Sequence, residues 1–131
     1  MKRSKTPTPR PTQAELEILA ILWRLGPSSV RDVHDELRDL RDTGYTTILK
    51  LLQIMTEKGL VARDESQRSH IYSARVPQRE TQRQLLDDLT ERAFSGSASA
   101  LVMQALSGRK ATRAELDAIR RLLDEIEGGR R

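Results

Sequence analysis

The chain has 131 residues, of which 37% are hydrophobic and 32% are charged, and its net charge is +4. This length fits one domain with a small appended unit, and the low apolar content favours burying surface against a second subunit. The absence of cysteine excludes disulfides and thiolate metal sites. The two histidines, His34 and His70, lie far apart without a carboxylate cluster, so we expect no metal and no cofactor.

Hydropathy and the N-terminus bear on location. No apolar stretch reaches the roughly 20 residues of a membrane span, and no apolar run follows the basic N-terminus as it would in a signal peptide. We therefore expect a cytoplasmic protein without membrane insertion.

Residues 1–11 contain three prolines and the basic residues Lys2, Arg3, Lys5 and Arg10. They predict a flexible basic arm, which either follows a DNA backbone or only aids solubility.

Two capped helices are predicted after the arm. Residues 12–15 (Thr-Gln-Ala-Glu) form a capping box, and the helix that they open should end at Gly26-Pro27. Ser29 with Asp32 predicts the start of a second helix. Its apolar face comprises Val30, Val33, Leu37 and Leu40. Arg31 lies in the first turn of this helix, where backbone N–H groups and a cation together suit a phosphate.

Residues 43–59 predict a third helix, which ends at Gly59. One face is apolar and comprises Ile48, Leu51, Leu52 and Met55. The opposite face carries Thr46, Lys50, Gln53 and Glu57, with Thr47 beside them near the N-terminus. The candidate DNA-contacting side chains are Thr46, Thr47, Lys50 and Gln53. Hydroxyl, ammonium and amide groups donate and accept hydrogen bonds at base edges and phosphates. An ordinary solvated helix face is the alternative, and the neighbouring elements decide against it.

A basic hairpin follows the third helix. Residues 60–64 and 69–74 read as strands around a polar turn, with Arg63 and Arg68 as candidate phosphate contacts. Three helices followed by a two-stranded wing are the order of a winged helix-turn-helix, whose third helix enters the major groove. We therefore predict a mainly α fold with a small β-hairpin wing, and a DNA-binding domain over residues 12–76.

Residues 77–131 predict three further helices, which would form a helical dimerisation region. The middle one contributes Leu101 and Val102, and the last one places apolar residues at spacings of 3, 4 and 3, namely Leu116, Ile119, Leu123 and Ile126. Three small helices bury little surface alone, so we expect them to pair with a second copy. Packing back on the same chain is the alternative.

The recognition helix also resembles that of a known family. Gly44-Tyr45-Thr46-Thr47-Ile48, then Leu52, then Glu57-Lys58-Gly59-Leu60-Val61, is similar to the signature of the penicillinase-repressor family of BlaI and MecI type. The likeness extends to residues 14–19, to Leu22-Trp23 and to a wing ending in Tyr72. It covers residues 12–76, and the rest matches in helix layout. This chain departs from many relatives at Ile54, where they carry arginine.

The resemblance implies several functional features. Members of the family repress genes for antibiotic resistance or cell-envelope stress, and a membrane-linked sensor protease is the implied partner. Relief of repression in relatives follows a cut in the middle helix of the dimerisation region. The matching bond in this chain is Gln104–Ala105, where relatives carry asparagine followed by an aromatic residue.

We therefore predict a homodimeric, sequence-specific repressor that binds an inverted-repeat operator on double-stranded DNA. A winged-helix module for protein–protein contact and a ligand-induced regulator are the alternatives. Binding to random duplex would separate DNA binding from the contact module, because only DNA binding depends steeply on salt. An enzyme is not expected, since no nucleophile-elbow motif, glycine-rich phosphate loop or His/Asp constellation is present.

Overall fold

The computed structural model describes residues 10–40, 42–108 and 110–129, so residues 1–9 of the predicted arm lie outside the described part. The chain divides into two compact units, Met1–Leu85 and Leu86–Arg131. The predicted boundary after residue 76 falls between the last strand, which ends at Ala74, and helix α4 (Gln78–Ala93), whereas the compact units divide within α4.

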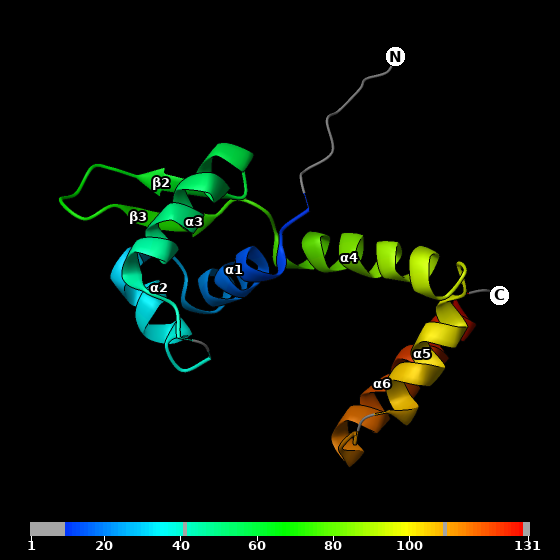
Figure 1. Cartoon of the computed structure of the whole chain (residues 1–131). Helices are drawn as coiled ribbons and strands as arrows, with labels where there is room; N and C mark the ends of the chain where they lie inside the picture. The colour runs from blue at the N-terminus through cyan, green and yellow to red at the C-terminus, as the bar shows by residue number, and fades with distance from the viewer. Residues whose placement is uncertain (1–9, 41, 109, 130–131) are drawn as a thin grey trace. The chain divides into compact units, whose positions relative to one another are not determined.

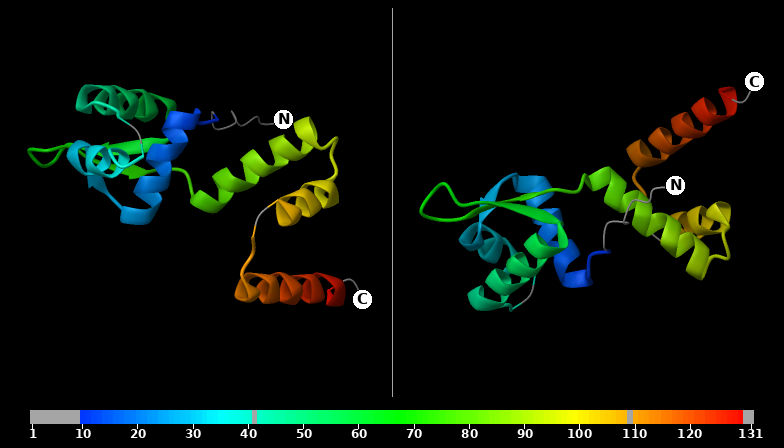
Figure 2. Two further views of the ribbon diagram at one scale, coloured as in Figure 1. Left: turned by 60° about the horizontal axis from the view of Figure 1, so that its bottom comes forward. Right: turned by 90° about the horizontal axis from the view of Figure 1, so that it is seen from above.

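The first unit contains three helices and a small sheet (Figure 1). The elements in chain order are α1 (Gln13–Leu25), β1 (Ser28–Ser29), α2 (Val30–Leu37), α3 (Tyr45–Lys58), β2 (Val61–Asp64) and β3 (Ile71–Ala74). The strands pair antiparallel in the order β1-β3-β2. The loop between β2 and β3 projects beyond the three helices in each view of Figures 1 and 2. The predicted winged helix-turn-helix is thereby confirmed.

The helix ends follow from local sequence. Thr12 and Ser29 each cap a helix and form capping boxes with Glu15 and Asp32, as predicted. Helix α3 ends at Gly59, whose φ of 84° lies in the left-handed region that glycine adopts without strain. These local signals place the start of α1, the start of α2 and the end of α3 where the sequence predicts them.

The core of the first unit lies between the three helices and the sheet. Its fully buried members include Ile18, Leu19, Val33, Ile48, Leu52, Met55, Leu60 and Tyr72.

The prediction that Leu40 belongs to the apolar core face of the second helix is wrong. Leu40 is 70% exposed, because α2 ends at Leu37 and the following residues form a tight turn in which the Leu40 N–H donates to the Leu37 carbonyl. Strand β1 was not predicted, because two serines carry no strand signal of their own.

The second unit begins within α4 and continues with α5 (Ala98–Ser107) and α6 (Arg113–Gly128). Thr112 caps α6 in a capping box with Glu115, as predicted. No side chain of α5 or α6 is fully buried. The apolar side chains of this unit that are most exposed are Leu86, Leu89, Val102, Met103, Leu106, Leu122, Leu123 and Ile126. The single chain therefore leaves the apolar faces of this unit uncovered.

None of the helices in the described ranges is both long and apolar enough to cross a membrane. Nor do three histidine or carboxylate side chains in these ranges come together in a way that could hold a metal ion.

Candidate nucleic-acid interface

Helix α3 presents one face to the core and the other to solvent. Ile48, Leu52 and Met55 have no exposed surface and anchor the helix on the core of the first unit. The four predicted DNA-contacting residues of this helix are all exposed, namely Thr46, Thr47, Lys50 and Gln53. Ile54 is half-buried. The polar face of α3 is thus accessible from solvent.

A hollow of about 400 Å³ lies beside α3. It is lined by residues from the start of α2, the first turns of α3, strand β3 and the hairpin loop, namely Ser29, Val30, Arg31, Tyr45, Leu49, Arg68, Ser69, His70 and Tyr72. Arg31 and Arg68, which are 37 positions apart in the printed sequence, are brought to one site. Two guanidinium groups beside the N-terminus of α2 and several hydroxyls form a surface suited to a phosphate.

Several lining residues were not predicted as contacts. Tyr45 is 48% exposed, and its ring meets His34 edge-on with centroids 6.0 Å apart. Ser69 and His70 directly follow Arg68 in the loop before β3. The sequence signal that could have identified Ser69 and His70 as contacts is their position directly after Arg68, because both side chains carry hydrogen-bonding groups. The hollow that unites them with Tyr45 depends on the hairpin packing beside α3.

Arg63 differs from the other predicted wing contact. Its Nη2 lies 2.6 Å from Glu65 Oε2, and its side chain is 31% exposed. In the β2–β3 ladder it stands opposite Tyr72. The Tyr72 hydroxyl, and after it the Glu65 carboxylate, raises the pKa of Arg63. Arg63 does not line the hollow, and its charge is already paired within the wing.

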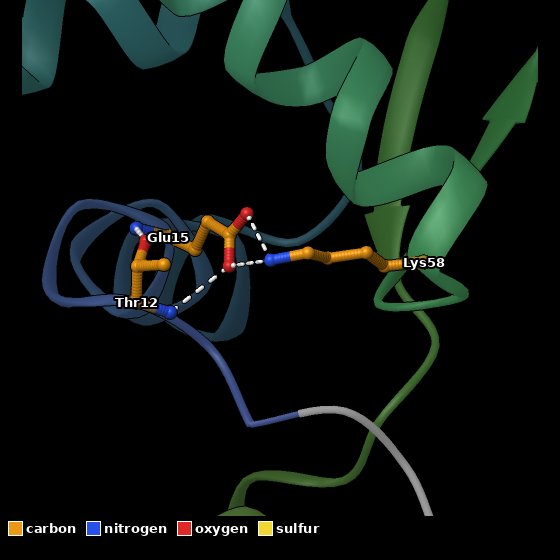
Figure 3. A network of polar contacts seen from close by, with 3 residues as sticks. All are labelled: Thr12, Glu15 and Lys58. Atoms are coloured by element: carbon orange, nitrogen blue, oxygen red, sulfur yellow. Dashed lines mark hydrogen bonds and ion pairs between the residues drawn. The ribbon is translucent and has the colours of Figure 1, made fainter.

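A partly buried ion pair fixes the far end of α3 (Figure 3). Lys58 Nζ lies 2.9 Å from each carboxylate oxygen of Glu15, whose side chain is only 2% exposed. The same carboxylate accepts from the Thr12 N–H at 2.9 Å and so also closes the capping box of α1. The pair therefore ties the C-terminus of the recognition helix to the N-terminus of α1.

The surroundings of the Glu15 carboxyl group favour its ionised form. Burial raises its pKa, but the Thr12 backbone N–H and the Lys58 ammonium stabilise the ionised form more strongly, and the net pKa is lowered. The sequence predicted Glu15 as a capping residue, whereas its partner 43 positions away follows only from the packing of α3 on α1.

The residues predicted for dimerisation all lie in the second unit and remain accessible. Leu101, Leu116 and Ile119 are half-buried. Val102, Leu123 and Ile126 are 47%, 59% and 49% exposed. Two hollows interrupt this surface. One of about 260 Å³ is lined by α5, α6 and their connection, including Leu106 and Ile119, and one of about 460 Å³ lies along α6 at Leu123 and Ile126.

The predicted cleavage bond lies within α5. Gln104 and Ala105 are both exposed, and the Gln104 carbonyl accepts from the Gly108 N–H at 3.0 Å. A protease needs an extended strand of substrate, so a cut here requires the end of α5 to open locally.

The chain is similar to a known protein family and to several transcriptional regulators. The penicillinase repressor family model matches residues 11–125. Two Mycobacterium tuberculosis strains each carry a transcriptional regulator BlaI that is 35% identical over 117 residues, covering 88% of this chain and 83% of theirs. Methicillin resistance regulatory protein MecI of Mammaliicoccus sciuri is 20% identical over 114 residues, covering 87% of this chain and 93% of its own.

One solved structure shares the fold of the first unit. It is the DNA-binding domain of the repressor BlaI, with a TM-score of 0.50 and 22% sequence identity. The match covers 56% of this chain and 90% of that chain. At this identity the likeness concerns the fold alone.

Proposed function

Since this chain belongs to the penicillinase repressor family, whose matched members include transcriptional regulators, we propose that it represses transcription as a homodimer on an inverted-repeat operator. One observation carries the proposal: the exposed polar face of α3 lies beside a hollow that unites Arg31 and Arg68. A helix that reads bases and flanking cations that hold phosphates are the two parts of a winged-helix contact with DNA.

The side chains have distinct roles in this proposal. Thr46, Thr47, Lys50 and Gln53 meet base edges in the major groove. Arg31 and Arg68 hold a backbone phosphate in the hollow beside α3. Arg63 contributes to the same electrostatic surface, but less strongly, because it must first exchange its bond with Glu65 for one with DNA.

The uncovered second unit supports the homodimer. Its apolar side chains on α5 and α6 include none that is fully buried in the single chain. Covering them with the same faces of a second copy would remove this apolar surface from water. The residues proposed for this interface are Leu101, Val102, Leu116, Ile119, Leu123 and Ile126.

Relief of repression is the next part of the proposal. A membrane-linked sensor protease would cause the chain to be cut at Gln104–Ala105 and thereby separate α6 from the winged helix. The controlled genes would serve antibiotic resistance or cell-envelope stress, and the repressor would act in the cytoplasm, where it meets its operator. A small-molecule inducer is the alternative, which predicts derepression without a cut.

Selection of duplexes by the purified chain tests the proposal. Repeated selection from random DNA should yield an inverted repeat, and sedimentation should show two chains on each duplex. Binding should weaken steeply with salt, because each neutralised phosphate releases counterions. Recovery of no common sequence, together with salt-independent binding, would instead favour a protein–protein contact module.

A further inference from the structure

Trp23, the only tryptophan of the chain, ties α1 to the segment that leaves the sheet. Its indole Nε1 donates to the Val76 carbonyl oxygen at 2.9 Å, across 53 positions of sequence. Both residues are partly buried and pack against the core of the first unit. The distance is that of an ordinary N–H···O hydrogen bond, and the indole has no other donor to offer. A specific bond therefore holds the exit segment in addition to packing.

The exit segment is held on both sides of Val76. Before it, the Arg75 N–H donates to the Leu60 carbonyl at 2.9 Å. After it, the Pro77 carbonyl accepts from the Thr81 N–H at 3.1 Å, which closes the first turn of α4. Thr81, in this first turn, is only 4% exposed. The segment that leads from the sheet into α4 is thus held by hydrogen bonds at Arg75, Val76 and Pro77.

Helix α4 then continues without a break to Ala93, past the division of the two units after Leu85. An unbroken helix transmits the direction of its first turn along its length more faithfully than a flexible linker does. The Trp23 bond acts on the segment immediately before that first turn. Any loosening of this bond should therefore widen the range of directions in which the chain leaves the winged helix.

We propose that Trp23 is a positioning residue that sets which spacing between operator half-sites the dimer accepts. The inference rests on the proposed homodimeric function. Linked binding sites gain effective concentration only when the linkage spans the distance between them, and a rigid linkage favours one spacing. Dimeric helix-turn-helix proteins bind half-sites whose separation mirrors the protein's own geometry. An exit segment held by the Trp23 bond would narrow the range of accepted half-site spacings, and a loosened exit segment would widen that range.

The test compares the full-length chain with Trp23→Phe, which keeps an aromatic ring and removes the N–H donor. A half-site is first selected with the wild-type chain. Dissociation constants are then measured on a duplex with one half-site and on duplexes whose two half-sites are separated in single base-pair steps. Ile18→Val is the matched control, because it removes one methylene from the buried side of the same helix and leaves both partners of the Trp23–Val76 hydrogen bond in place. Circular dichroism checks that each variant is folded.

The wild-type chain and Ile18→Val should show one sharp spacing optimum. Trp23→Phe should bind the single half-site within about twofold of the wild type. Its affinity at the optimum should fall by about tenfold, and neighbouring spacings should lose less, so that the spacing profile flattens. An unchanged profile in folded Trp23→Phe would overturn the proposal. Equal losses on one and two half-sites would do the same, since they would indicate a general loss of folding or DNA contact.

A second variant keeps the inference testable if Trp23→Phe does not fold. Inserting Gly-Ser after Pro77 leaves the Trp23 bond intact and detaches α4 from the held segment. This insertion should also flatten the spacing profile while half-site affinity is retained, and an unchanged sharp optimum would overturn the proposal. If the wild-type chain itself binds two half-sites no better than one, the homodimeric function has failed, which is a separate outcome.

Discussion

Single residues on the exposed face of α3 should decide which DNA sequence is bound. We predict that Lys50→Ala and Gln53→Ala weaken binding to the selected operator much more than to random duplex. Each lost base contact should reduce discrimination by about 1–3 kcal/mol. Dissociation constants on both duplexes at one salt concentration provide the measurement. Glu57→Ala, at another exposed position of α3, is the control. Equal weakening on both duplexes would instead show that Lys50 and Gln53 contact only the DNA backbone.

Another prediction at this scale concerns the partly buried pair of Glu15 and Lys58. The pKa of Glu15 is lowered in the folded chain, so its charge stabilises the fold above the unfolded value of about 4.3. That stabilisation is lost as the pH falls through the lower folded value. Glu15→Gln should reduce the free energy of unfolding at pH 7 by about 1–3 kcal/mol. The difference from the wild type should therefore become smaller as the pH falls below the unfolded value.

Urea unfolding between pH 3 and pH 7 measures this difference. Glu57→Gln is the control, because it removes an exposed carboxylate from the same helix as Lys58. A loss of stability for Glu15→Gln that is equally large at pH 3 and pH 7 would show that shape, and not charge, is what the substitution removes.

Among the elements, the start of α2 and the wing should supply affinity without sequence preference. Arg31→Ala and Arg68→Ala should each weaken binding to every duplex and reduce the slope of log affinity against log salt by about 1. Arg63→Ala should have a smaller effect, because Arg63 is already paired with Glu65. Arg38→Ala, at the other end of α2, is the control. Unchanged slopes for Arg31→Ala and Arg68→Ala would show that the hollow is not part of the DNA interface.

Helix α6 is the element expected to hold the dimer. Replacing both Ile119 and Leu123 with Asp would place unpaired charge in the interface and should give monomers in sedimentation. The fold of the single chain should survive, because Leu123 is 59% exposed and Ile119 only half-buried. Operator affinity should then fall by about 10²–10⁴, the usual gain from linkage. Arg121→Asp, on another face of α6, should remain dimeric. A dimeric double mutant would contradict the assignment.

For the whole molecule, we predict that induction produces a cut between Gln104 and Ala105. Truncation after Gln104 imitates the product and removes α6. The truncated chain should keep half-site affinity and lose the gain from linkage, about 10²–10⁴ on the operator. Mass spectrometry of the chain recovered from induced cells identifies the cut. Derepression while the full-length chain persists would exclude cleavage and favour a ligand.

The predictions from sequence were accurate where the signals are local. Helix starts at Thr12, Ser29 and Thr112 depend on groups three residues away, and the stop at Gly59 depends on its own backbone freedom. The spacing of Ile48, Leu52 and Met55 likewise fixed the buried face of α3, and with it the exposure of Lys50 and Gln53. Leu40 was misplaced because periodicity alone does not show where a helix stops.

The tertiary structure alone decided which distant residues meet. It gave Lys58 its partner Glu15, gave Trp23 its acceptor on Val76, and paired β1 with β3. It also joined Arg31 to Arg68 and His70 around one hollow and left Arg63 with Glu65. The sequence by itself determined the helices, the two wing strands and the polar face of α3, because caps and periodicity act over a few residues. Contacts across 43 or 53 positions exist only once the helices have packed on the sheet.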